Sequence, residues 1–222
     1  MALILHIDTA SSVASVSIAK DGTVLAFIEN ELVNEHASFL QPAIQEMLSN
    51  TGISVRDIDA IAVANGPGSY TGLRVGLASA KGLSYALGKP LITIGTLPLM
   101  AHAAAAVENN DTLLYAPMID ARRMEVFTGV YDAAGNEKLT ASAMLLDNDS
   151  FVALLLLQKI LFFGSGAEKF RKICTHANAL FSTDYSTVQS FAQLSNEAYQ
   201  FNRFARLAYS EPQYLKEFYT GK

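Results

Sequence analysis

The sequence is poor in the residues that mark several common classes of protein. It has one cysteine, Cys174, and no tryptophan among its 222 residues. A single cysteine excludes an intramolecular disulfide and is typical of a reducing compartment, so we expect a cytoplasmic protein. The longest uninterrupted hydrophobic run, Phe151–Leu157, is far too short to cross a bilayer. The first residues enter an apolar segment without a basic leader, so the sequence predicts neither secretion nor contact with a membrane.

Basic residues do not gather in the sequence either. The formal net charge is −5 at pH 7, and no cluster of Lys and Arg is longer than the pair Arg122–Arg123. A chain that holds nucleic acid by itself usually carries a basic face. If RNA is involved, we therefore expect another subunit to do most of the binding.

Motifs of catalysis are also missing. The four histidines are scattered, with no two of them four positions apart, so no pair shares a helical face as a zinc or iron site would need. The Gly-x-Ser-x-Gly elbow of many hydrolases is absent. The sequence predicts no metal site and no catalytic residues.

Two segments of the chain follow the same order of elements. Each begins with a short strand that ends in Ile-Asp, at Ile7–Asp8 and at Ile119–Asp120. A second strand, a polar turn and a third strand follow in both, and Asp21–Gly22 is a strong hairpin signal. A helix, a strand, a Gly-x-Gly turn and another helix complete each segment, with the turns at Gly66–Gly68 and Gly164–Gly166. The order βββαβα is therefore predicted twice.

This duplicated order predicts an α/β protein of two halves, each a mixed sheet with helices on its faces. It is similar to the plan of the actin-like ATPase (ASKHA) fold, whose active members hold a nucleotide between the halves. We expect a first half at residues 1–100 and a smaller second half at residues 101–222, whose last helix packs back on the first half. In the second half, Asn148–Ser150 is expected to cap a helix at Phe151–Leu157.

The aspartates that end the two hairpin strands are the candidates for contact with a nucleotide. Phosphate-binding hairpins need glycine where backbone N–H groups meet oxygen. Here Ala10 stands two residues after the first aspartate, where active members of the fold have glycine, and Ala121–Met124 after the second aspartate contains no glycine. The candidate cofactor-binding residues are Asp8, Thr9, Ser11 and Asp120. An aspartate at a strand end is also a common Asx-turn residue, and this interpretation stays open. We expect independent ATP hydrolysis to be weak or absent.

The helix predicted over Leu73–Leu87 carries a stripe of small side chains. Gly72, Gly76, Ala80 and Ser84 recur every four positions and so lie on one ridge. A smooth ridge lets another backbone approach closely, and that backbone can belong to the chain's own sheet or to a helix of a partner. The spacing alone leaves both interpretations open.

Several motifs together resemble the TsaB (YeaZ) family, bacterial proteins needed to make threonylcarbamoyladenosine in tRNA. The most specific is NGPGSYTGLRVG at Asn65–Gly76. It is accompanied by Ile7–Ala10 and by IDARRMEVF at Ile119–Phe127. The tail motif Pro212–Lys216 extends the resemblance over nearly the whole chain.

The resemblance implies a subunit without catalytic activity. Members are paralogues of TsaD, the catalytic subunit that transfers threonylcarbamoyl to adenosine next to the anticodon of ANN-decoding tRNAs. TsaD carries a His-x-x-x-His metal site on the helix after the strand that corresponds to Leu91–Gly95. Here that helix has only His102, with Ala106 four residues on. We therefore expect a pseudoenzyme with no cofactor of its own that binds and activates TsaD.

The resemblance also implies partners and a surface. The small ATPase TsaE joins the complex, ATP or ADP lies near the interface with the partner, and tRNA is contacted mainly through the complex. The helices at residues 36–48 and 71–87 pair with TsaD, or with a second copy when TsaD is absent. The expected partner-binding residues are His36, Phe39, Leu40, Ala43, Tyr70, Thr71, Gly72, Leu73, Gly76, Leu77, Ala80 and Leu83.

Two alternatives from other functional classes remain. The chain could act as an autonomous actin-fold ATP-dependent kinase or ATPase, which tight binding of Mg-ATP by the isolated protein would favour. It could also be a stand-alone structural homodimer, which a concentration-dependent mass with no response to TsaD would favour.

Overall fold

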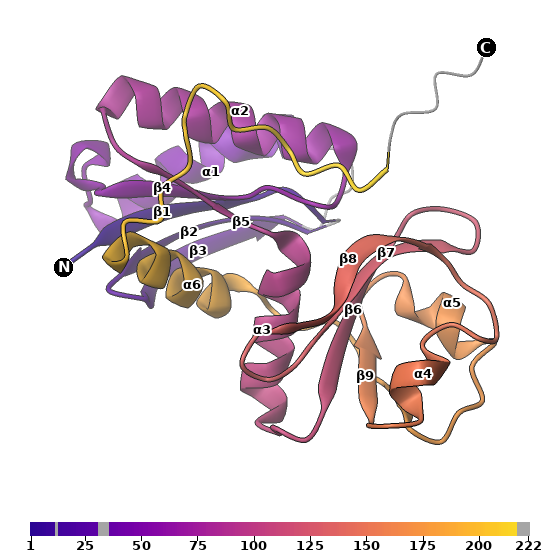
Figure 1. Ribbon diagram of the computed structural model, residues 1–222. Coiled ribbons are helices and arrows are strands. Elements are labelled where there is room, and N and C mark those ends of the chain that lie inside the picture. The colour runs from indigo at the N-terminus through magenta and orange to yellow at the C-terminus, as the bar shows by residue number, and fades with distance from the viewer. Residues whose placement is uncertain (12, 31–35, 217–222) are drawn as a thin grey trace, which may run out of the picture. The chain divides into compact units, whose positions relative to one another are not determined.

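The computed structural model describes residues 1–11, 13–30 and 36–216, with residues 36 and 37 described by their backbone only. The chain forms two compact units (Figure 1). Unit 1 comprises Met1–Thr96 and Thr187–Gln213, and unit 2 comprises Leu97–Ser186 and, of the described residues, 214–216.

Unit 1 is built on a five-stranded mixed sheet of order β3-β2-β1-β4-β5. The strands are β1 (Leu3–Asp8), β2 (Ala14–Lys20), β3 (Thr23–Asn30), β4 (Ala60–Ala64) and β5 (Leu91–Ile94). The first three strands pair antiparallel, and β4 and β5 run parallel to β1. The predicted Asp21–Gly22 hairpin joins β2 to β3, with both residues at positive φ, as a two-residue turn of this kind requires.

Helices cover both faces of this sheet (Figure 1). α1 (His36–Thr51) and α2 (Tyr70–Leu87) lie on one face, and α6 (Val188–Gln200) lies on the other. Leu5 and Ile7 point into the core with the first two helices, while His6 between them bonds to Ser195 of α6 at 2.6 Å. This alternation follows from the two-residue period of a strand. A short 3₁₀ helix, Val55–Asp57, precedes β4.

Unit 2 repeats the plan with a sheet of order β10-β9-β6-β7-β8. Its strands are β6 (Leu114–Asp120), β7 (Glu125–Tyr131), β8 (Glu137–Leu145), β9 (Ile160–Phe163) and β10 (Ala179–Phe181). Its helices are α3 (Thr96–Glu108, whose first residue belongs to unit 1), α4 (Val152–Leu155) and α5 (Ala167–Arg171). α3 shares a core cluster with Tyr115 and Ile119, whereas α4 and α5 share one with Ala116 and Met118. The predicted duplication is confirmed, and each half adds one more strand and one more helix.

The two units exchange their last helices. α3 follows the last strand of unit 1 along the chain but packs in unit 2, and α6 follows the last strand of unit 2 but packs in unit 1. The units are therefore discontinuous in sequence and divide at Thr96 and Leu97, whereas the expected halves were the continuous ranges 1–100 and 101–222.

One local prediction is wrong. Asn148–Ser150 does not cap a helix at Phe151–Leu157, because α4 covers only Val152–Leu155 and Phe151 precedes it at φ 63° without a side-chain cap. The Ser150 hydroxyl instead donates to Asp147 Oδ1 at 2.8 Å. Ser and Asp side chains can close such a local turn as readily as they cap a helix, because both arrangements satisfy the same hydrogen-bonding groups.

Candidate functional site

The carboxyl group of Asp8 lies at the end of β1, where the first hairpin of unit 1 turns. The side chain is buried, with 6% exposed, and its Oδ1 accepts a hydrogen bond of 3.0 Å from the backbone N–H of Ala10. Burial raises the pKa of Asp8 to about 6, because the charged form is poorly solvated, and the Ala10 hydrogen bond offsets part of this rise. The Asx-turn interpretation of this aspartate is confirmed.

The two hydroxyls after Asp8 bond within the chain. Thr9 is fully buried, and its hydroxyl donates to the carbonyl of Gly72 on α2 at 2.7 Å. Ser11 is exposed, and its hydroxyl donates to the carbonyl of Val13 at 2.9 Å. These two candidate residues therefore stabilise the hairpin and its contact with α2.

The glycine turn that joins β4 to α2 is filled by the chain's own backbone. A Cβ on Gly68 would lie 2.1 Å from the carbonyl oxygen of Ala10, and one on Gly66 would lie 2.6 Å from that of Gln213. Backbone hydrogen bonds of 2.7 Å hold both of these neighbours beside the turn. Glycine is needed here because a Cβ would block intramolecular contacts. The arrangement does not fit a phosphate cradle.

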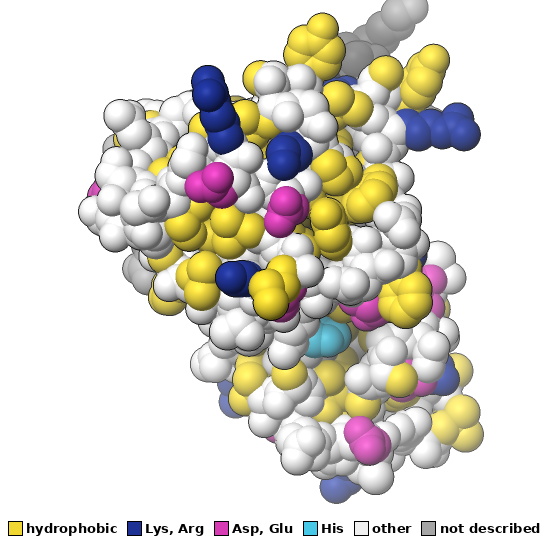
Figure 2. Space-filling model, turned by 90° about the vertical axis from the view of Figure 1, so that its left-hand side faces the viewer, with side chains coloured by type: hydrophobic (Ala, Val, Ile, Leu, Met, Phe, Trp, Pro, Cys, Tyr) yellow, Lys and Arg dark blue, Asp and Glu magenta, His cyan; other side chains and the backbone are white. Residues whose placement is uncertain are grey.

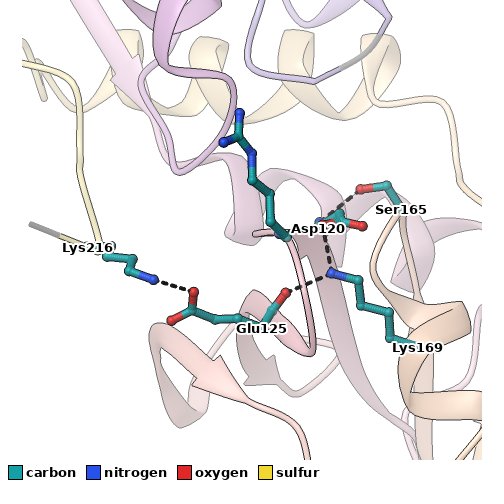
Figure 3. Close-up of polar contacts among 6 residues, drawn as sticks. Asp120, Glu125, Ser165, Lys169 and Lys216 are labelled. Carbon is teal, nitrogen blue, oxygen red and sulfur yellow. Dashed lines mark hydrogen bonds and ion pairs between the residues drawn. The ribbon is translucent and has the colours of Figure 1, made fainter. Parts of the chain in front are cut away.

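The second hairpin, between β6 and β7 in unit 2, carries a network of ion pairs (Figure 3). Lys169 of α5 donates to Asp120 Oδ1 at 2.7 Å and to the backbone carbonyl of Glu125 at 3.1 Å. The Ser165 hydroxyl, in the Gly-Ser-Gly turn, accepts from the backbone N–H of Asp120 at 3.1 Å. Lys216 pairs with the Glu125 carboxylate at 2.5 Å. The tail motif thus reaches this hairpin of unit 2.

The network determines the charge of Asp120. Partial burial alone would raise the pKa of this carboxyl group, but hydrogen bonds from Lys169 and from the backbone N–H of Arg122 hold it below its ordinary value of 3.8. Asp120 is therefore an anion whose charge is already balanced by an ammonium, which weakens its attraction for a metal ion. Sequence reasoning missed Lys169, which lies 49 positions away. The available signal was the Gly-Ser-Gly turn in register with Ile119–Asp120.

The stripe of small residues on α2 faces the sheet of unit 1. A Cβ on Gly76 would lie 2.3 Å from Thr9 Oγ1. Ala80 and Ser84 are buried, and the carbonyl of Gly72 accepts the Thr9 hydrogen bond. The structure thus decides for the intramolecular interpretation of the stripe. It corrects the prediction that Gly72, Gly76 and Ala80 contact a partner helix, because these positions already contact their own sheet.

The other expected partner-binding residues divide by exposure. Four are buried in the core of unit 1, namely Leu40, Ala43, Leu73 and Leu77. Three are half-buried, namely Phe39, Tyr70 and Leu83, and Thr71 is exposed. The side chain of His36 lies outside the described residues. Apart from Thr71, the exposed positions of α2 were not predicted. They are Arg74, Ala78, Gly82, Tyr85 and Ala86.

Two hollows open on the surfaces of the separate units. One of about 460 Å³ lies in unit 2 at the carboxyl ends of β9 and β10, beside Glu168 and Arg171. The other, of about 590 Å³, lies in unit 1 between the β2–β3 turn and α6. Across the described ranges, no three His, Cys, Asp or Glu side chains are grouped as a metal site requires. In the same ranges no helix is long and apolar enough to cross a membrane.

The charged side chains drawn in Figure 2 are dispersed. Lys and Arg are scattered among acidic and uncharged groups on this face, while hydrophobic side chains gather in several patches. A nucleic-acid surface would concentrate the basic groups. This face therefore offers little electrostatic attraction for an RNA backbone.

Comparisons with known proteins agree on one family. The family model described as "TsaD: tRNA N6-adenosine threonylcarbamoyltransferase" matches residues 28–219. The Escherichia coli tRNA threonylcarbamoyladenosine biosynthesis protein TsaB is 41% identical over 133 residues, which are 60% of this chain and 56% of that protein. The chain spans about half the length of these curated relatives, 56% of the Escherichia coli TsaB and 54% of the Bacillus subtilis TsaB.

Solved structures show the same fold. YeaZ from Pseudomonas aeruginosa superposes with a TM-score of 0.79 at 24% identity, covering 97% of this chain and 100% of that one. Component A of the (R)-2-hydroxyglutaryl-CoA dehydratase of Acidaminococcus fermentans gives a TM-score of 0.54 at 11% identity, covering 91% and 100%. Together with the matching strand orders of the two sheets, these likenesses confirm the predicted fold class.

Proposed function

Because this chain belongs to the TsaD family, on its TsaB (YeaZ) branch, we propose that it takes part in the synthesis of threonylcarbamoyladenosine in tRNA. Its role is that of a non-catalytic subunit that binds TsaD and activates threonylcarbamoyl transfer. TsaE completes the complex, tRNA is contacted mainly through it, and a second copy replaces TsaD when TsaD is absent. The complex operates in the cytoplasm.

The main observation in support of the non-catalytic role is that the glycine turn Gly66–Gly68 is filled by the chain's own backbone. Gly66 and Gly68 contact Gln213 and Ala10, so the turn has no space for phosphate oxygens while those contacts persist. In the second hairpin, Lys169 already balances the charge of Asp120. Both features favour a subunit that relies on its partner for chemistry. ATP or ADP is then expected near the interface with TsaD.

We propose that the partner surface lies on the exposed sides of α1 and α2. Thr71, Ala78 and Gly82 form the smooth outer side of α2, and a Cβ on Gly82 would meet no atom within 4 Å. Ser38 and Gln41 continue the exposed surface on α1. An interface helix that crosses α2 here can approach its backbone closely, because these side chains are small.

Reconstituted threonylcarbamoyl transfer to tRNA tests both parts of the proposal. The assay contains cognate TsaD, TsaE, ATP and the threonylcarbamoyl-adenylate donor, with or without this protein. Modification should require this chain, and the chain alone should be inactive. Equal modification without it would refute the proposed role, and strong thermal stabilisation of the isolated chain by Mg-ATP would then favour an autonomous kinase or ATPase.

Ala78→Arg tests the surface by its affinity for TsaD. It places a bulky charge on the exposed side of α2, so binding to TsaD should fall at least about ten-fold through the cost of burying that charge. Ala106→Arg is the matched control, since Ala106 is an exposed alanine of α3. Normal binding by Ala78→Arg would refute the surface and leave the function standing.

A further inference from the structure

The C-terminal segment Ala205–Gln213 runs across unit 1 from β5 along α2 to the glycine turn (Figure 1). At its start, the N–H of Ala205 donates to the carbonyl of Leu91 at 2.8 Å. At its end, the N–H of Gln213 donates to the carbonyl of Asn65 at 2.7 Å. Both ends are therefore fixed by backbone hydrogen bonds.

Lys81 of α2 holds the middle of the segment. Its Nζ donates to the carbonyl of Ser210 at 3.0 Å and to that of Ala208 at 3.5 Å. Leu207, within the same stretch, packs against the core of unit 1. The segment is thus attached to α2 at a point three turns along the helix.

Gly66 lies between the end of the segment and the first turns of α2. A Cβ built on Gly66 would lie 2.6 Å from the Gln213 carbonyl oxygen and 3.1 Å from Leu73 Cδ1. Leu73 is buried, and its N–H donates to the carbonyl of Ser69 at 2.8 Å, closing the start of the helix. Displacement of Gln213 therefore removes the support on one side of the turn that begins α2.

We propose that the segment Ala205–Gln213 is a positioning element that fixes the first turn of α2 and, with it, the start of the partner surface at Thr71. The second part of this inference rests on the proposed function. The segment acts through backbone groups and through Lys81. Displacement of its end at Gln213 leaves the sheet and the core of unit 1 in place but frees the start of α2.

Gln213→Pro tests the positioning in the full-length protein. Proline removes the N–H that donates to Asn65, whereas the matched variant Gln213→Ala keeps it. Lys81→Met is a second variant that removes the donor to Ser210 but keeps the aliphatic stem. The measurements are amide hydrogen exchange of residues 66–76 and the affinity for TsaD.

In Gln213→Pro, exchange at Leu73 and its neighbours should be about five-fold faster or more, as expected when one backbone hydrogen bond and its packing are lost. Affinity for TsaD should fall only as far as the fraction of molecules with an ordered first turn falls, so the loss of affinity should not exceed the change in exchange. Gln213→Ala should match the wild type, and Lys81→Met should shift both readouts in the same direction as proline. Unchanged exchange at residues 66–76 in Gln213→Pro and Lys81→Met would overturn the proposal. If exchange changes but wild-type protein does not bind TsaD, the positioning stands and the proposed function fails.

Discussion

Replacing Asp8 by asparagine should make the protein more stable at alkaline pH and leave it unchanged in acid. Asp8 has a pKa of about 6 in the folded protein against an ordinary value of 3.8, because burial disfavours its charge. At a pH between these two pKa values, Asp8 is protonated in the folded state and has released its proton in the unfolded state. The stability that this proton contributes is complete below pH 3.8 and is lost as the pH rises through about 6.

The size of the effect follows from the two pKa values. Their difference, at 1.36 kcal/mol per pKa unit, corresponds to about 3 kcal/mol. Asparagine has nearly the same shape, and its amide oxygen can accept the hydrogen bond from Ala10. His6 has the opposite effect in the wild type, since burial lowers its pKa from 6.5 to about 4 and stability is lost as the pH falls through this range. The two effects therefore partly cancel in the pH dependence of the wild-type free energy of unfolding. The difference in this free energy between variant and wild type reports the contribution of Asp8 alone.

Urea unfolding at about pH 3.5, 5 and 8 measures this difference. Asp8→Asn should exceed the wild type in free energy of unfolding by about 3 kcal/mol at pH 8 and by close to zero at pH 3.5. Asp111→Asn, at an exposed aspartate in the turn before β6, is the control and should show no such trend. A difference that is the same at all three pH values would refute the reasoning.

Three further substitutions test the packing of unit 1 in urea unfolding. Gly76→Ala should destabilise by about 1–3 kcal/mol, because the new Cβ would lie 2.3 Å from Thr9 Oγ1. Gly82→Ala on the exposed side of the same helix should instead stabilise the protein by about 0.5–1 kcal/mol. Equal effects of Gly76→Ala and Gly82→Ala would contradict the close packing of Gly76 against Thr9. Ser195→Ala removes the partner of the buried His6 Nε2, which lies 2.6 Å away, and should cost about 1–3 kcal/mol. A loss below about 0.5 kcal/mol would show that the contact contributes little.

The order of the elements could be predicted from the sequence because its signals are local. The Ile-Asp strand ends, the Asp21–Gly22 turn and the two Gly-x-Gly turns each act within a few residues, and their repetition revealed the duplication. The packing of α6 in unit 1 agrees with the expectation that the last helix packs back on the first half, but the packing of α3 in unit 2 could not be predicted in this way. A helix contacts whichever sheet face its connection allows, and this choice depends on contacts such as that of His6 with Ser195, 189 positions apart.

The candidate site shows a second limit, which concerns glycine. A stripe of small residues such as Gly72, Gly76 and Ala80 indicates that another backbone approaches the helix closely, but it does not indicate which backbone. The same holds for Gly66 and Gly68, whose neighbours in the structure are the carbonyl oxygens of Gln213 and Ala10. In both cases glycine is required by contacts from a distant part of the chain. The Pro212–Lys216 motif therefore belongs physically with the glycine turn, because the backbone carbonyl of Gln213 occupies the space that makes Gly66 necessary.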